Sequence, residues 1–202
     1  MPGGRNEAGR RRRFRRLCFP AAPPFNEAKA TQAAARLLTL RGGSMSYIKL
    51  IKLLYLADRE ALIRWGYPIT TDCYVSMDIG PVVSRIYDLI RNEPPLHSVW
   101  IWHKSISDPE HYEVHLLSDP GSSELTHPEQ DLIDEVFARH GRQNRWTVVD
   151  YTRRLPEWTH PDGGALPIAY RDILKAADKT ESEISVVEEA LECAALEERV
   201  LV

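Results

Sequence analysis

The segment Tyr47–Ala57, YIKLIKLLYLA, constrains the fold most strongly, because nine of its eleven residues are apolar or aromatic. Ser44 or Ser46 can begin a helix here, and Gly66 is a typical residue to end it after Trp65. A helix that is apolar on nearly all of its faces is a buried helix. No apolar run approaches the length of about 20 residues that a membrane span requires. We therefore expect the other elements to pack around this central helix, and we expect no membrane partner.

The length and composition of the chain fit one globular domain with tails. The chain has 202 residues, of which 43% are hydrophobic and 27% are charged, and these values are typical of globular proteins. A domain of this length can bury a sufficient core without a structural metal. The three cysteines form no CxxC pair, so we expect no thiolate zinc site and a reducing, cytoplasmic environment.

Helical periodicity and capping residues predict a mainly α-helical domain. Asn26 is a good N-cap for a helix over residues 27–40. The capping box of Thr126 and Glu129 begins another helix, which Gly141 ends. Further helices are expected over residues 81–91, 146–155, 167–177 and from residue 180 onward.

A small β component is also expected. Residues 73–77 form a short extended stretch, whereas Pro81 is well placed as the first residue of a helix. Residues 99–104 and 111–117 are rich in aromatic and β-branched residues, and this predicts a β-hairpin. The predicted fold class is mainly α (α+β), a compact helical domain around a buried central helix, with a small β-hairpin.

Charge is distributed unevenly along the chain. Residues 1–16 contain seven arginines and one glutamate, whereas the remainder contains 19 Lys and Arg residues against 28 Asp and Glu residues. An acidic body argues against a domain built to hold DNA phosphates. We divide the chain into a disordered basic extension (1–25), a helical domain (26–178) and an acidic helix (179–202) that packs on the domain or on a partner.

The basic extension has three interpretations. It can be an arm that binds nucleic acid or a membrane surface, or a solvated tail without a role. Alternatively, the start is misassigned and translation begins at Met45. It is not a good secretory signal, because its apolar part is short and interrupted by prolines. The arginines of a nucleic-acid arm would be Arg10, Arg11, Arg12, Arg13, Arg15 and Arg16.

The polar residues of the central helix are candidates for a functional site. Lys49, Lys52 and Arg59 lie on one stripe about 80° wide, at about 100° per residue. Their stems can cover the core while the charged heads reach the surface or pair with carboxylates. The alternative is a recognition stripe for an acidic partner or a phosphate. Asp58 lies on the opposite face beside Tyr55, and such a set can perform acid–base catalysis, although a buried hydrogen-bond network is the interpretation we favour.

The chain lacks the motifs that identify common enzyme classes. The GxGxxG, P-loop, HExxH and GxSxG patterns are all absent. His111 and His115 are expected in one strand, where about 13 Å would separate them, which is too far to share a metal ion. Gly80-Pro81 precedes a predicted helix N-terminus, but a rigid turn is the simpler interpretation. We expect no enzyme activity, no catalytic residue, no cofactor and no metal site.

Four short segments carry a more specific signature. They are, in chain order, Lys49–Asp58, Gly66–Ile69, Tyr74–Met77 and Gly80–Tyr87. In order and spacing they resemble the KLxKLLYxAx, yGxPi, yxAm and GPVxSxIY motifs of the Panacea domain, also called the SocA-like or GepA-like domain. The resemblance extends more weakly to about residue 177. It is looser near a Trp-bearing loop, where an Arg stands in place of the His of a Thr-His pair.

This resemblance implies a mostly helical domain that serves as the antitoxin of a bacterial or prophage toxin–antitoxin pair. Such domains bind and neutralise a toxin protein encoded by the neighbouring gene. Some are thought to act as adaptors that deliver the toxin to a AAA+ protease. The domain occurs with many unrelated toxins, so it does not identify the toxin. The signature residues, which would contact the partner or hold the fold, are Lys49, Lys52, Tyr55, Asp58, Arg59, Gly80, Pro81, Ser84 and Tyr87.

Two hypotheses about binding follow from charge. The acidic body can complement a basic toxin, such as one that acts on RNA, and this would speed association. The alternative function is a nucleic-acid-binding regulator that uses the basic arm on operator DNA. The two are compatible, because many antitoxins also repress their own operon.

Overall fold

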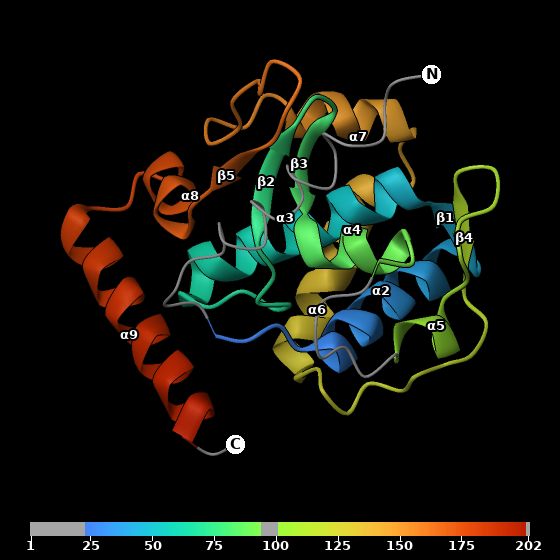
Figure 1. Cartoon of the computed structure of the whole chain (residues 1–202), viewed down its shortest axis with the longest axis horizontal. Coiled ribbons are helices and arrows are strands. Elements are labelled where there is room, and N and C mark those ends of the chain that lie inside the picture. Colours follow the sequence, from blue (N-terminus) through green and yellow to red (C-terminus); the bar gives the residue numbers. More distant parts are fainter. Residues whose placement is uncertain (1–22, 94–100, 201–202) are drawn as a thin grey trace.

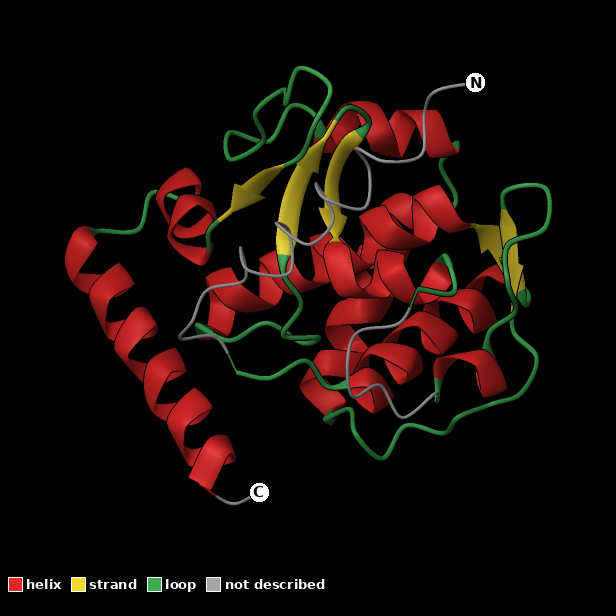
Figure 2. Ribbon diagram, viewed as in Figure 1, coloured by secondary structure: helices red, strands yellow, loops and turns green. Residues whose placement is uncertain are grey.

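The computed structural model describes residues 23–93 and 101–200. Figures 1 and 2 show them as a mainly helical body with two small sheets. Helix α3 (Tyr47–Trp65) passes through the middle of this body. Its eleven residues from Ile48 to Asp58 are all buried, which confirms the prediction of a buried central helix. The fold class is mainly α with a small β component, as expected.

Three helices that pack against α3 are α2 (Glu27–Arg41), α6 (His127–Val136) and α7 (Arg145–Thr152). Asn26 caps α2 as predicted, because its side chain accepts a hydrogen bond from the backbone N–H of Lys29 at 2.9 Å. The predicted capping box begins α6. A short π-helix, η1 (Phe137–Gly141), continues α6 to the predicted stop.

Helix α2 supplies much of the core through small and aliphatic side chains. Five of them, at Ala30, Ala33, Ala34, Leu37 and Leu38, are at most 1% exposed. A chain that began at Met45 would lack α2, and it would leave the facing side chains of α3 and α6 open to water.

The larger sheet is built around β2 (Tyr74–Met77). Strand β3 (Gly80–Val83) pairs with one edge of β2 and β5 (Leu166–Ile168) with the other, both antiparallel. The smaller sheet joins β1 (Ser44–Ser46) to β4 (Glu113–His115). In the part of the chain that the structure describes, the β-hairpin is therefore β2–β3.

The prediction that Pro81 begins a helix is wrong. Pro81 lies in β3, and α4 (Ser84–Ile90) starts only after that strand. Proline is tolerated because β3 is an edge strand of its sheet, where a missing N–H leaves no ladder hydrogen bond unmade. The start of α4 is set by Asp72, whose carboxylate accepts hydrogen bonds from the N–H groups of Arg85 and Ile86 at 2.8 and 2.9 Å.

The predicted hairpin of residues 99–104 and 111–117 is also wrong. Residues 99 and 100 lie outside the described residues, and α5 (Trp102–Ser105) is a short helix. The second predicted strand does form, as β4, but it pairs with β1. Trp102 is fully buried, and its backbone N–H donates to the carboxylate of Glu27 at 3.0 Å. At Trp102 the aromatic side chain therefore reflects burial in a helix and not strand pairing.

The last two helices are α8 (Tyr170–Ala176) and α9 (Glu181–Val200). Pro167 lies in β5, so the predicted helix begins three residues later than expected. Side-chain and backbone groups of Thr180 and Glu183 cap α9 as predicted. Figure 1 shows α8 and α9 beyond β5, at the opposite end of the larger sheet from α7. Among the described residues, no helix has the length and apolar character to cross a membrane.

Candidate functional site

A buried network joins α3 to a loop that follows α7. Tyr55 Oη donates a hydrogen bond to Glu157 Oε1 at 2.8 Å, and Arg59 Nε donates to the same oxygen at 2.7 Å. Tyr55 is fully buried, and the side chain of Glu157 has no exposed surface. The network therefore fixes this loop onto the central helix across 98 positions of sequence.

The same loop is fixed to the hairpin by its next two residues. Trp158 Nε1 donates to the carbonyl oxygen of Met77 at 3.1 Å, and the N–H of Thr159 donates to Ser76 Oγ at 3.2 Å. The guanidinium of Arg153 lies over the Trp158 ring, 5.1 Å from its centroid. The loop thus connects α3, the hairpin and the end of α7.

The two signature lysines turn their ammonium groups inward. Lys52 Nζ donates to the carbonyl oxygen of Pro81 at 2.6 Å. Lys49 Nζ donates to the carbonyl oxygens of Gly141 and Gln143, the latter at 2.7 Å. Gly141 ends η1, where carbonyl groups without helical partners favour a cation. Both lysines are buried, and neither pairs with a carboxylate of the described residues, so only Arg59 of the predicted stripe behaves as expected.

Burial changes the acid–base properties of Lys52. The residue is 1% exposed, and within the described residues the carbonyl of Pro81 is its hydrogen-bond partner. A neutral carbonyl replaces little of the lost hydration of an ammonium group. Burial therefore lowers the pKa of Lys52 to about 7.

We expect Lys52 to make the protein more stable at pH 9 than at pH 7, by about 2 kcal/mol. The folded protein releases the Lys52 proton near pH 7, whereas the unfolded chain retains it until the ordinary lysine pKa of 10.5. Raising the pH in this window therefore favours the folded state. Lys52→Met should lose the gain, which urea denaturation of both proteins at the two pH values measures. The same pH dependence in both would show that Lys52 stays charged when folded.

Asp58 joins α3 to the segment before β2. Its carboxylate accepts hydrogen bonds from the N–H of Thr70 at 2.9 Å, from Thr70 Oγ1, and from Tyr74 Oη at 3.0 Å. Burial raises the pKa of Asp58 to about 6, although these hydrogen bonds oppose the rise. Within the described residues this network shares no hydrogen-bond partner with that of Glu157, although the rings of Tyr55 and Tyr74 lie edge to face with their centroids 5.4 Å apart. The Lys, Tyr, Asp and Arg side chains of the central helix are therefore not brought together at one point.

The other signature residues lie in β3 and α4, where Gly80 and Pro81 belong to the hairpin and Ser84 and Tyr87 to the helix that follows it. Gly80 and Pro81 are buried, whereas Ser84 and Tyr87 are half-buried. Gly80 has a φ of 96°, and a Cβ there would lie 2.9 Å from Thr152 Oγ1. The close approach of β3 to α7 therefore requires glycine at this position.

Glu157 was not among the predicted site residues. No signal in a single sequence pairs it with Tyr55 or Arg59, because the contact spans about half the chain. The role of Asp72 at the start of α4 was not predicted either, because the residues around it are typical of a turn.

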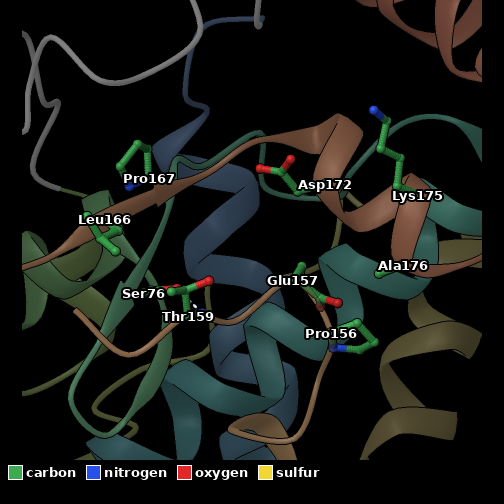
Figure 3. A pocket seen from close by; sticks show the side chains of 9 residues that line it. All are labelled: Ser76, Pro156, Glu157, Thr159, Leu166, Pro167, Asp172, Lys175 and Ala176. Carbon is green, nitrogen blue, oxygen red and sulfur yellow. Dashed lines mark hydrogen bonds between the residues drawn. The ribbon is translucent and has the colours of Figure 1, made fainter. Parts of the chain in front are cut away.

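A shallow hollow of about 500 Å³ lies between the larger sheet, α8 and the loop after α7 (Figure 3). The charged side chains that line it bind other groups of the protein. Glu157 binds α3, Asp172 Oδ2 accepts from the N–H of Ala169 at 2.9 Å, and Lys175 pairs with Glu181 at 2.9 Å. The lining residues are Ser76, Pro156, Glu157, Thr159, Leu166, Pro167, Asp172, Lys175 and Ala176.

Two further sets of candidate residues concern nucleic acid and metal binding. The arginines of the predicted arm, Arg10, Arg11, Arg12, Arg13, Arg15 and Arg16, lie outside the described residues. Within residues 23–93 and 101–200, no three His, Cys, Asp or Glu side chains are grouped as a metal ion would need.

Comparison with protein families matches residues 50–159 to the family described as "Antitoxin SocA-like, Panacea domain". The matched range covers more than half of the chain. It begins within α3 and ends in the loop after α7, so it contains both sides of the Glu157 network. Comparison with curated proteins and with solved structures finds no match.

Proposed function

The chain belongs to the antitoxin SocA-like, Panacea domain family, and from this premise we propose that it binds a co-encoded toxin protein and neutralises it by direct contact. In this proposal the protein is a binding module and not an enzyme. The observation that supports it is the use of the signature within the fold. Five signature residues of α3 bind partners within the protein, namely Lys49, Lys52, Tyr55, Asp58 and Arg59. These residues therefore stabilise the fold, and a partner has to bind other residues at the surface.

Co-expression tests the proposal. Each gene next to this one is induced alone and then together with it, and the tagged antitoxin is purified. We expect one neighbour to stop growth alone, to be harmless together with this protein, and to co-purify with it. If no neighbour is toxic, or if a toxic neighbour is not rescued, the proposal is wrong.

The amount of toxin in the rescued cells separates direct neutralisation from delivery to a AAA+ protease. A toxin held in a complex should persist at its full level on an immunoblot while growth continues. A proteolytic adaptor would instead lower that level, and deletion of the protease would restore both the toxin and the growth arrest. We expect the first result.

A further inference from the structure

The arginines of the described residues differ in whether they have an ionic partner. Six of them pair with carboxylates, namely Arg36, Arg59, Arg64, Arg91, Arg139 and Arg171. Arg142, Arg145, Arg153 and Arg154 form no ion pair with any residue that the structure describes. All four lie in α7 or within three residues of its ends. Four arginines without an ion pair among the described residues, in and around one short helix, distinguish this surface in an acidic protein.

Aromatic side chains lie among these arginines. Trp146 is 50% exposed and Tyr151 is 45% exposed. The guanidinium of Arg145 lies over the Trp146 ring, 5.1 Å from its centroid. The ring of His140 lies 4.7 Å from that of Tyr151. We call this surface the α7 face, and it consists of Arg142, Arg145, Trp146, Tyr151, Arg153 and Arg154.

The buried signature fixes the position of the α7 face. Lys49 binds carbonyl oxygens on the turn that leads into α7, and Gly80 allows β3 to approach Thr152 at its end. The loop after α7 is fixed by Glu157. Buried signature residues therefore hold the α7 face in a fixed position. A surface that is already ordered loses less entropy when a partner binds.

The composition of the α7 face favours a protein partner over nucleic acid. Between residues 137 and 160 the chain has no lysine, whereas surfaces that contact phosphates use lysine as well as arginine. Arginine, tryptophan and tyrosine are the residues enriched in protein–protein hot spots, where lysine is depleted. Residues 139–154 contain five arginines and one aspartate, so the complementary surface carries negative charge.

We propose that the α7 face binds the toxin, and that it contacts an acidic surface of the toxin that also has apolar groups. This inference rests on the proposed function and adds the site and the charge of the partner. It also reverses the expectation from net charge, which favours a basic toxin. Net charge describes the whole chain, whereas the contact depends on the charges that meet in the interface.

Single charge reversals test the proposal. The toxin identified by co-expression is titrated against full-length Arg145→Glu, Arg154→Glu and the control Lys104→Glu. Lys104 is exposed on α5, has no ion pair among the described residues, and undergoes the same change in charge. We expect each arginine variant to raise Kd at least about tenfold. The control should stay within about twofold of the wild type. Melting temperatures of the three variants should match that of the wild type, because Lys104 and Arg154 are exposed, Arg145 is half-buried, and substitutions at the surface rarely unfold a protein.

Three results would overturn the inference. If the arginine variants bind the toxin like the wild type, the α7 face is not the site, although the proposed function stands. If they keep the toxin but lose binding to a 30-bp duplex from the promoter that the wild type retains, the face binds nucleic acid. If the wild-type chain itself binds no neighbouring toxin, the proposed function fails and this inference fails with it.

Discussion

Glu157→Ala is expected to lower the free energy of unfolding by about 3 kcal/mol or more, because removing one partner leaves buried charged and polar groups unpaired. The variant would leave the Arg59 guanidinium and the Tyr55 hydroxyl without their acceptor. The arginine side chain is 13% exposed and the tyrosine is fully buried, so water can replace little of the lost interaction. Urea denaturation measures the change.

Glu135→Ala is the matched control for this variant. Glu135 also accepts from two side chains, Arg64 at 2.8 Å and Arg139 at 3.1 Å, but it lies at the surface. Exposed ion pairs contribute little to stability because water and salt compensate their loss. We therefore expect almost no change in melting temperature. Equal effects of the two variants would mean that Glu157 is not buried in solution.

The Glu157 variant also tests how the fold supports binding. Loss of the Glu157 carboxylate should detach the loop from α3. The contact between Trp158 and Arg153 at the end of α7 should then be lost as well. Toxin binding should then weaken at a temperature where the variant is still folded. Unchanged affinity at that temperature would show that the loop does not position the α7 face.

The second large effect is expected from Gly80→Ala, which should destabilise the protein by about 2 kcal/mol more than Gly43→Ala. Both glycines have a φ of 96°, so the backbone strain of an added Cβ is common to the two variants. At Gly43 nothing lies within 4 Å of the new atom, whereas at Gly80 it meets Thr152 Oγ1 at 2.9 Å and Lys52 Nζ at 3.3 Å. The difference between the variants therefore measures the crowding between β3 and α7.

A double-mutant cycle identifies the cause of this difference. In a Thr152→Ala background the closest atom is gone, so Gly80→Ala should cost less than it does in the wild type. A cost that is the same in both backgrounds would show that Thr152 Oγ1 is not the cause of the difference. The melting temperatures of the four proteins in the cycle are sufficient for the comparison.

Local signals in the sequence were sufficient for helices α2, α3 and α6. The side chain of Asn26, the Thr126 capping box and the apolar run of α3 act within one or two turns, so they have the same effect in any fold. Pro81 was misassigned because its preference for a first helical turn competes with its tolerance in an edge strand. Which of the two applies depends on β2, an element outside the local segment.

The sequence by itself determined that the protein is a helical domain with a buried central helix and a Panacea signature. It also determined that Lys49, Lys52, Tyr55, Asp58 and Arg59 lie on that helix. The tertiary structure alone decided the partners of these residues. A carboxylate 98 positions away, carbonyl groups at the ends of β3 and η1, and a threonine before β2 become neighbours only when the chain packs.

The same distinction applies to charge. The count of acidic and basic residues is a property of the sequence, and it describes an acidic body. Folding then pairs six of the described arginines with carboxylates, whereas the arginines of the α7 face, which are exposed or, at Arg145, half-buried, have no ionic partner among the described residues. Coulomb interactions depend on distance and burial, so only the tertiary structure decides which charges are compensated and which remain available to a partner.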